Sequence, residues 1–389
     1  MADAYDFWAE RIPPSDSAAI DRFWDRFAEI APALDATFNR TAEPVDVASS
    51  MDQALGDLAE RVTSWEFGAA ERGHFLALLP ELGHEKRPLI RALVSRAPTL
   101  EGWEFGDACR PIEQIDLVAH LVASRAHKPF SLKGASSYAG SHRRIDIMGQ
   151  GAGSDADAQA GLVFSVLFGE TVERDWLGEI GIERPSGGII SRLIGKASPP
   201  KSPEAWLTSF QEKTQHLLDQ LMEDRPKAAL AAQLGPGAEV SLFQCVPRES
   251  DNPRSDSITY QTAHTELADA RFAGARISSV RFSRHSESLL GLRIERTLEQ
   301  PFDQVSDRGD LAERIDSALR DADAGGVYGE GHGTGHVYID FATRDIPIAI
   351  ATVELVLSRA EVSGSAAFLF DEAGLEQRVL PIQASRSPH

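Results

Sequence analysis

Hydrophobic and polar residues alternate most clearly over His336–Phe341, where every second residue is apolar. This period predicts a β-strand with one apolar face, and the opposite face would carry His336, Tyr338 and Asp340. Six glycines precede this strand within residues 325–335, and we expect them at turn and bulge positions that need positive φ. The run Asp345–Arg359 follows, with apolar residues at helical spacing. This part of the chain therefore predicts a glycine-rich hairpin whose apolar face is covered by a helix.

Helical spacing also appears near the start of the chain, over residues 20–34. Phe23, Trp24 and Phe27 should lie in the core, and Pro32 should end or kink this helix. The tetrapeptide WEFG occurs twice, at residues 65–68 and 103–106. An aromatic residue alternating with Glu before a Gly is typical of a strand that runs into a loop. We expect both copies to contribute to a paired aromatic core.

Residues 185–203 are rich in Pro, Gly and Ser, which favours a linker. We therefore predict an N-terminal domain at 15–185, a linker with a connecting helix at 186–235, and a C-terminal domain at 236–389. Apolar or alternating runs in the C-terminal half predict an antiparallel sheet, at residues 240–246, 257–261, 277–282 and 289–294. The expected fold class is α+β, with a mixed or antiparallel sheet in each domain and helices packed on one face.

The chain has 389 residues and a formal net charge of −20, with the composition of a soluble globular protein. This charge argues against binding to nucleic acid, since neutralising phosphates needs an excess of Lys and Arg, and it permits a basic protein partner. No basic and apolar signal segment and no run of about 18 apolar residues is present, so we expect no membrane span and a cytoplasmic location. Cys109 and Cys245 lie far apart, which favours reduced thiols.

No cofactor is predicted from the glycine-rich segments. The loop Gly149–Ser154 has a serine where a dinucleotide-binding loop needs its third glycine, and two aspartates follow where a phosphate would sit. Gly195-Lys196 likewise does not complete a P-loop, because Ala197 stands where Ser or Thr is needed.

The candidate chemistry lies on the hairpin strand. His332, His336 and Asp340 are four residues apart, a spacing that would suit a metal ion on a helix. On an extended strand four residues span about 13 Å, so one ion could bridge them only if the chain folds back at the glycines. The favoured interpretation is a non-enzymatic regulatory or inhibitory protein-binding module with an acidic surface, whose binding residues are His332, His336, Tyr338 and Asp340. The alternative is a metal-assisted hydrolase built on His332, His336 and Asp340.

Two stretches resemble known families. Leu167-Phe168-Gly169-Glu170 and Gly178-Glu179-Ile180 resemble the end of an uncharacterised bacterial family, and the likeness covers about residues 20–185. That family brings no established activity with it. The strand Tyr338-Ile339-Asp340-Phe341, with the order helix, hairpin, helix, strand, resembles a second bacterial domain of unknown function over about residues 294–370. This domain is also loosely similar to the ferredoxin-like fold of the regulator that inhibits ribonuclease E.

Overall fold

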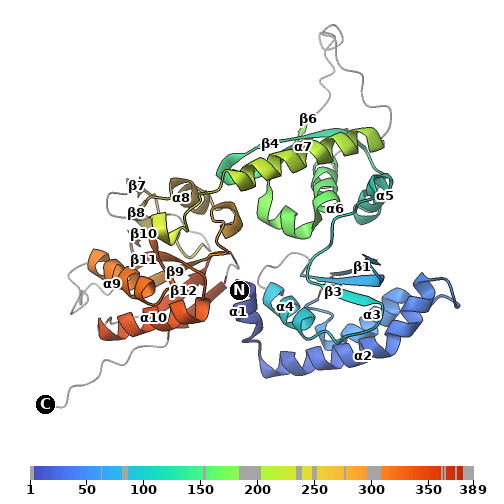
Figure 1. Ribbon diagram of the computed structural model, residues 1–389, viewed down its shortest axis with the longest axis horizontal. Coiled ribbons are helices and arrows are strands. Elements are labelled where there is room, and N and C mark those ends of the chain that lie inside the picture. Colours follow the sequence, from blue (N-terminus) through green and yellow to red (C-terminus); the bar gives the residue numbers. More distant parts are fainter. Residues whose placement is uncertain are drawn as a thin grey trace, which may run out of the picture. The chain divides into compact units, whose positions relative to one another are not determined.

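The computed structural model describes residues 4–62, 64–80, 86–151, 155–183, 203–233, 239–247, 252–275, 277–295, 308–360, 362, 365–372 and 375–379. The fold is α+β, and its described strands form one seven-stranded and two three-stranded sheets (Figure 1). The chain divides into two compact units: Met1–Asp107 with Pro226–His389, and Ala108–Arg225. This division differs from the predicted boundaries, because the second unit crosses residue 185 and interrupts the first. The predicted linker residues 186–202 lie outside the described residues.

The N-terminal part of the first unit packs four helices around a small sheet. The elements are α1 (Ala4–Ala9), α2 (Pro14–Phe38), α3 (Val47–Leu55), β1 (Ser64–Ala70), β2 (Gly73–Leu79), α4 (Arg87–Ser95) and β3 (Trp103–Gly106). Phe23, Trp24 and Phe27 are buried as predicted. Pro32, however, does not end α2, which continues to Phe38. Burial of Ala31 and Leu34 on the same face offsets the one backbone hydrogen bond that the proline removes.

Both copies of WEFG are strands of this small sheet, and they flank β2 on its two sides. β1 pairs with β2 antiparallel and β3 pairs with β2 parallel. The rings of Phe67 and Trp103 lie 5.8 Å apart, and those of Trp24 and Phe105 lie 4.7 Å apart. The predicted aromatic core is therefore confirmed.

In its described residues, the second unit contains a mixed sheet with the order β4-β5-β6 and three helices. Its elements are α5 (Ile115–Arg125), β4 (Leu132–Ala139), β5 (Ile145–Gly151), α6 (Ala156–Trp176), β6 (Leu177–Glu183) and α7 (Pro203–Glu223). α7 was predicted as a connecting helix, but its Trp206, Leu207 and Phe210 are buried in the same core as Phe164 of α6. The Pro-, Gly- and Ser-rich composition before α7 therefore indicates a connection between two elements of the same unit, and not a boundary between units.

The seven-stranded sheet belongs to the first unit and has the order β13-β12-β9-β11-β10-β8-β7, with every neighbouring pair antiparallel. Its strands are β7 (Ser241–Gln244), β8 (Ser257–Thr262), β9 (Ser288–Glu295), β10 (Gly325–Gly333), β11 (His336–Thr343), β12 (Ala366–Phe370) and β13 (Leu375–Val379). The helices packed on this sheet are α8 (Thr265–Phe272), α9 (Arg308–Asp321) and α10 (Ile346–Arg359). The strand predicted at 277–282 is absent; a 3₁₀ turn, Ser279–Arg281, lies there, with Ile277 and Phe282 buried in a small core with Leu267 of α8. Further 3₁₀ turns lie at Gly56–Leu58, Ser141–Arg143 and Ala231–Gln233.

The two faces of this sheet differ in character. Val337, Ile339 and Phe341 are buried in one core with residues of α9 and α10, which confirms the predicted apolar face. Figure 1 shows α9 and α10 lying against this sheet. Phe7 of α1 joins the same core, with its ring 5.2 Å from that of Phe370. We call this side the helix face, and the side that carries His336, Tyr338 and Asp340 the Asp340 face. In the described part of the chain, no helix combines the length and the apolar run that a membrane span needs.

Candidate functional site: a buried ionic network and its pocket

Asp340 lies at the centre of the Asp340 face, between two glycines on the neighbouring strands. Gly291 of β9 and Gly329 of β10 are its register partners. A Cβ at Gly291 would collide with the guanidinium of Arg254, and one at Gly329 would collide with the hydroxyl of Tyr260. The missing side chains therefore leave room for Arg254 and Tyr260 to lie across the sheet and reach the carboxylate.

This arrangement corrects the expected role of the glycine run. Of the six glycines from Gly325 to Gly335, all described, only Gly325 has a positive φ, of 143°. The expected bulges do occur, between Val327 and Gly329 and again between His332 and Gly333. Gly329 is needed because the Tyr260 side chain packs directly against it, and Gly331 because the carbonyl oxygen of Thr259 and the Tyr260 ring lie where a Cβ would be.

Three side chains donate hydrogen bonds to the carboxylate of Asp340, which has no exposed surface. Arg254 donates from Nη1 at 3.2 Å and from Nη2 at 2.6 Å. Arg271, in the last turn of α8, donates from Nη1 at 2.8 Å, and the Tyr260 hydroxyl donates at 2.6 Å. Four donors around one buried carboxylate satisfy it fully, which offsets the cost of removing it from water.

A second carboxylate, Asp371, follows β12 and closes the network. It accepts from Nη2 of Arg271 and, at 3.5 Å, from Nη2 of Arg254. Arg271 also donates from Nη2 to the Tyr328 hydroxyl at 2.6 Å. Two guanidiniums and two carboxylates balance in formal charge. We call Arg254, Arg271, Asp340 and Asp371, with Tyr260 and Tyr328, the ionic network.

The surroundings hold Asp371, Arg271 and the two tyrosines of the network in their ordinary charge states. Burial raises the pKa of Asp371, but the charges of Arg271 and Arg254 outweigh burial, so this pKa lies below its usual value. Burial lowers the pKa of Arg271, but Asp340 and Asp371 outweigh it and raise this pKa well above the usual value. Burial raises the pKa of Tyr260 and of Tyr328, so both phenols stay neutral.

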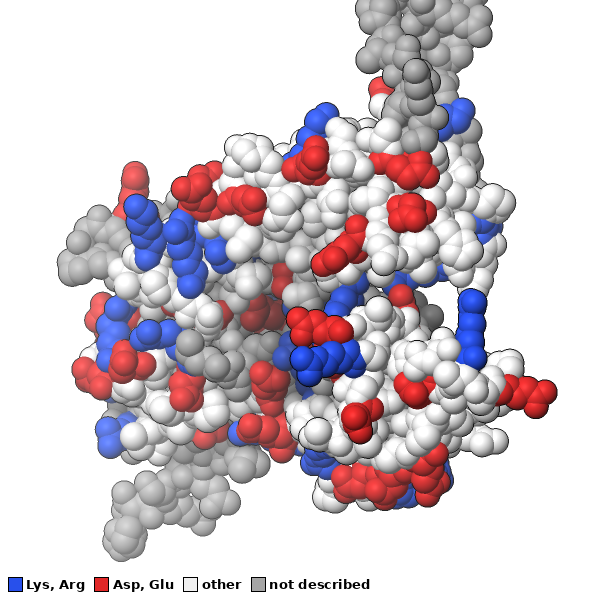
Figure 2. All heavy atoms as spheres, turned by 45° about the vertical axis from the view of Figure 1, so that its right-hand side comes forward, with Lys and Arg blue, Asp and Glu red and all other residues white. Residues whose placement is uncertain are grey.

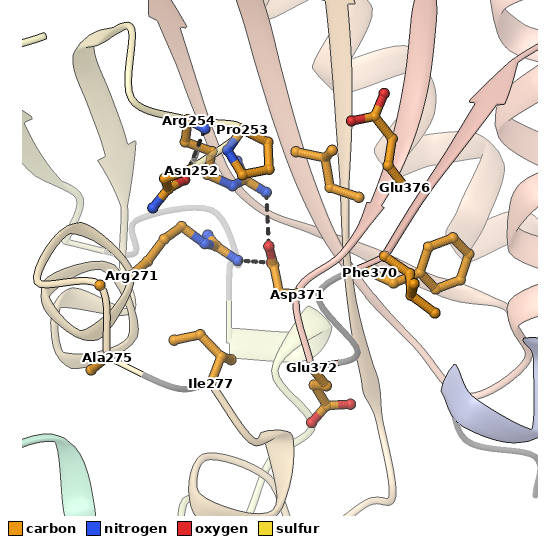
Figure 3. Close-up of a pocket in the computed structure, with 13 residues that line it drawn as sticks. Asn252, Pro253, Arg254, Arg271, Ala275, Ile277, Phe370, Asp371, Glu372 and Glu376 are labelled. Atoms are coloured by element: carbon orange, nitrogen blue, oxygen red, sulfur yellow. Dashed lines mark hydrogen bonds and ion pairs between the residues drawn. The ribbon is translucent and has the colours of Figure 1, made fainter. Parts of the chain in front are cut away.

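A pocket of about 520 Å³ opens beside Asp371 (Figure 3). Its walls include six apolar residues: Pro253, Ala275, Ile277, Leu369, Phe370 and Leu375. Figure 3 shows Arg254 and Arg271 reaching Asp371, with Glu376 and Glu372 at opposite ends of the view. We call this space the Asp371 pocket; its volume is typical of small-ligand sites.

The polar lining of the Asp371 pocket has a small excess of negative charge. Glu376 lies 2.8 Å from Nη2 of Arg293, and a carboxylate oxygen of Glu372 accepts the backbone N–H of Ser279. The residues that line the pocket include three carboxylates, Asp371, Glu372 and Glu376, and two guanidiniums, Arg254 and Arg271. Figure 2 shows acidic and basic side chains interspersed over the face in view, so the net charge of −20 does not gather there into one continuous patch.

The structure places the predicted binding residues differently from the expected exposed surface. Tyr338 and Asp340 are 1% and 0% exposed, because the segment Asn252–Asp256 folds over the Asp340 face. The Tyr338 hydroxyl donates to Asp256 and lies 2.9 Å from the carbonyl oxygen of Pro253. His336, half-buried, lies with Nδ1 3.1 Å from Oδ2 of Asp256. These contacts hold the segment that carries Arg254.

His332 lies away from the other predicted residues. It is the register partner of Val337 and therefore points to the helix face, where its Nδ1 is 2.9 Å from Oγ1 of Thr259. His332 and Asp340 are thus on opposite faces of the sheet, and the glycines do not fold the chain back between them. No group of three His, Cys, Asp or Glu within the described ranges could hold a metal ion. The alternative hydrolase loses its proposed ligand set.

Sequence reasoning missed Arg254, Arg271, Tyr260 and Asp371. The available hint was Gly291, an isolated glycine inside the apolar run LLGLRI, because such a glycine often marks a close approach of another group. Compared with protein-family models, curated proteins and solved structures, the chain gives no match in any of the three. The two resemblances to bacterial families therefore stay predictions.

Proposed function

We propose that this chain is a non-enzymatic regulatory protein that binds a basic protein partner, and that the Asp371 pocket receives a lysine or arginine side chain of that partner. The observation that carries the proposal is the combination of apolar walls with an excess of carboxylates in one pocket. Long basic side chains have an apolar stem and a charged head, and they bind surfaces that offer both environments.

The walls and the carboxylates suit different parts of such a side chain. The alkyl stem would pack on Ile277, Leu369 and Leu375, and the charged head would approach Glu372 at one end of the pocket or Glu376 at the other. A cationic head group suits a lining in which carboxylates outnumber guanidiniums. An anionic ligand would have to displace Asp371 from two buried guanidiniums.

The titration behaviour of the site favours binding over catalysis. A general acid or base works best when its pKa lies near the working pH. Here the pKa of Asp371 is below its usual value and those of Tyr260 and Tyr338 are above theirs, so none is brought toward neutrality. Each of the three is also bonded to another group of the protein: Asp371 to Arg271, Tyr260 to Asp340 and Tyr338 to Asp256.

The test uses a fluorescein-labelled nonapeptide of alternating Arg and Gly, followed by fluorescence anisotropy at low salt. Glu372→Gln and Glu376→Gln each remove one charge from the pocket, and the amide oxygen of Gln at 372 can still accept from Ser279. Each should raise the Kd about two- to fivefold, the range for a partly exposed ion pair.

The matched control is Asp323→Asn, which removes one charge from a side chain that is 95% exposed and lies outside the pocket. It should leave the Kd unchanged. Equal weakening by Asp323→Asn would mean that the peptide responds only to net charge, and absence of binding to the wild type would remove the proposed function.

A further inference from the structure

The strand β7 forms one edge of the seven-stranded sheet and pairs, among the described residues, only with β8. The backbone N–H of Cys245 donates to the carbonyl of Ile258 at 2.8 Å. In an antiparallel pair the direction of the backbone groups alternates, so those of Leu242 and Gln244 point away from β8. This edge therefore presents backbone donors and acceptors in the pattern that another strand would match.

β7 differs from the other edge strands of the three sheets. Each of the other five carries at least one charged residue, which is a common protection against pairing with another chain. These residues are Glu66 in β1, Glu104 in β3, Lys133 in β4, Glu179 and Glu183 in β6, and Glu376 and Arg378 in β13. β7 carries none, and the whole stretch from Val240 to Val246 is uncharged.

Apolar side chains on the same stretch are unusually exposed. Val240 is 51% exposed, Leu242 is 65% exposed and Val246 is 79% exposed. All three have even numbers, so in an extended strand they point to one face of the sheet. Charged side chains usually keep a sheet edge from pairing with another strand. This edge has none and exposes a row of apolar side chains instead.

We infer that β7 pairs antiparallel with β7 of a second copy of this chain, which joins the two seven-stranded sheets into one across a two-fold axis. Pairing centred on Phe243 places Val240 of one copy opposite Val246 of the other and Leu242 opposite Gln244, with the apolar rows on the same face. Two chains with a net charge of −20 repel each other, and this uncharged stretch brings no like charges opposite one another.

Sedimentation equilibrium on the full chain, over a range of protein concentrations, tests this inference. The wild type should show a monomer–dimer equilibrium that strengthens as salt screens the net charge. Leu242→Lys should weaken dimerisation about tenfold or more, because it puts a lysine on each strand of the new pair, and the two lysines are diagonal neighbours across it. The matched control Leu355→Lys, at a 50% exposed position on α10, should dimerise like the wild type.

Backbone amide exchange locates the contact. The amides of Leu242 and Gln244 should be protected at concentrations where the wild type is dimeric, and they should exchange freely in Leu242→Lys. Leu242 is largely exposed, so this change should leave the melting temperature almost unaltered. A wild type that stays monomeric at every concentration, or a dimer that Leu242→Lys and Leu355→Lys leave equally strong, would overturn the inference.

Discussion

Replacing Asp340 with Asn should strongly destabilise the seven-stranded sheet. The carboxylate has no exposed surface and accepts four hydrogen bonds, at 2.6 to 3.2 Å, from Arg254, Arg271 and Tyr260. Asn keeps the shape of the side chain but removes the charge and turns an N–H₂ group toward donors. Removing one partner of a buried ion pair costs about 3–5 kcal/mol, and we expect the lower end because Asp371 still neutralises part of the arginine charge.

Urea unfolding measures this loss. With an m-value of about 1–3 kcal/mol per M, a loss of about 3 kcal/mol lowers the midpoint by about 1 M or more. The chain has two compact units, so the urea curve can contain the unfolding of both. Amide exchange of β11 should therefore be measured as well, because it reports on the seven-stranded sheet alone. Asp323→Asn, at an exposed carboxylate, should stay within about 0.5 kcal/mol of the wild type. An Asp340→Asn protein with the midpoint of this control would refute the reasoning.

Three further changes test the same site. Gly291→Ala should clearly lower the melting temperature, because the added Cβ would collide with Arg254. The control Gly335→Ala should be nearly neutral, because its Cβ would lie 3.6 Å from the nearest atom. Equal effects of the two changes in thermal scans would contradict the packing argument. Tyr338→Phe should cost about 1–2 kcal/mol in urea unfolding, because Asp256 loses a buried donor; an unchanged midpoint would mean that this hydroxyl contributes nothing. The folded-state pKa of Asp371 is depressed, so its ionic contribution is complete above about pH 4, the unfolded value, and is lost as the pH falls through the folded value. The stability difference between wild type and Asp371→Asn should therefore shrink below about pH 4, and a difference that stays constant down to pH 2 would contradict the assignment.

The regular elements could be predicted because their periods are local. The alternation over His336–Phe341 and the helical spacing over Asp345–Arg359 correspond to β11 and α10, and the two WEFG segments to β1 and β3. The strand predicted at residues 277–282 was wrong. An apolar residue at each end of this segment is compatible with a turn over a small core as well as with a strand. The Pro- and Gly-rich stretch before α7 indicated a loop, but composition cannot say which unit the elements on either side join.

The ionic network could not be predicted because its members are distant in sequence. Arg254 and Asp340 are 86 residues apart, and Arg271 and Asp371 are 100 residues apart. Alternation correctly assigned Asp340 to the face opposite Ile339, but it could not show that Asn252–Asp256 and α8 cover that face. The same limit explains why His332, His336 and Asp340 looked like one group. Only the strand register separates His332 from the other two.

Side-chain methyl NMR of the chain, during titration with the Arg–Gly nonapeptide, tests the central claim most directly. The claim predicts that the methyl signals of Ile277, Leu369 and Leu375, which line the Asp371 pocket, shift together and saturate with one peptide. The signals of Leu242 in β7 and Leu355 in α10, which are exposed and lie outside the pocket, should stay in place. Shifts spread over all exposed methyl groups, or unmoved signals at Ile277, Leu369 and Leu375 in a protein that binds the peptide, would contradict the proposal that this pocket receives the basic partner.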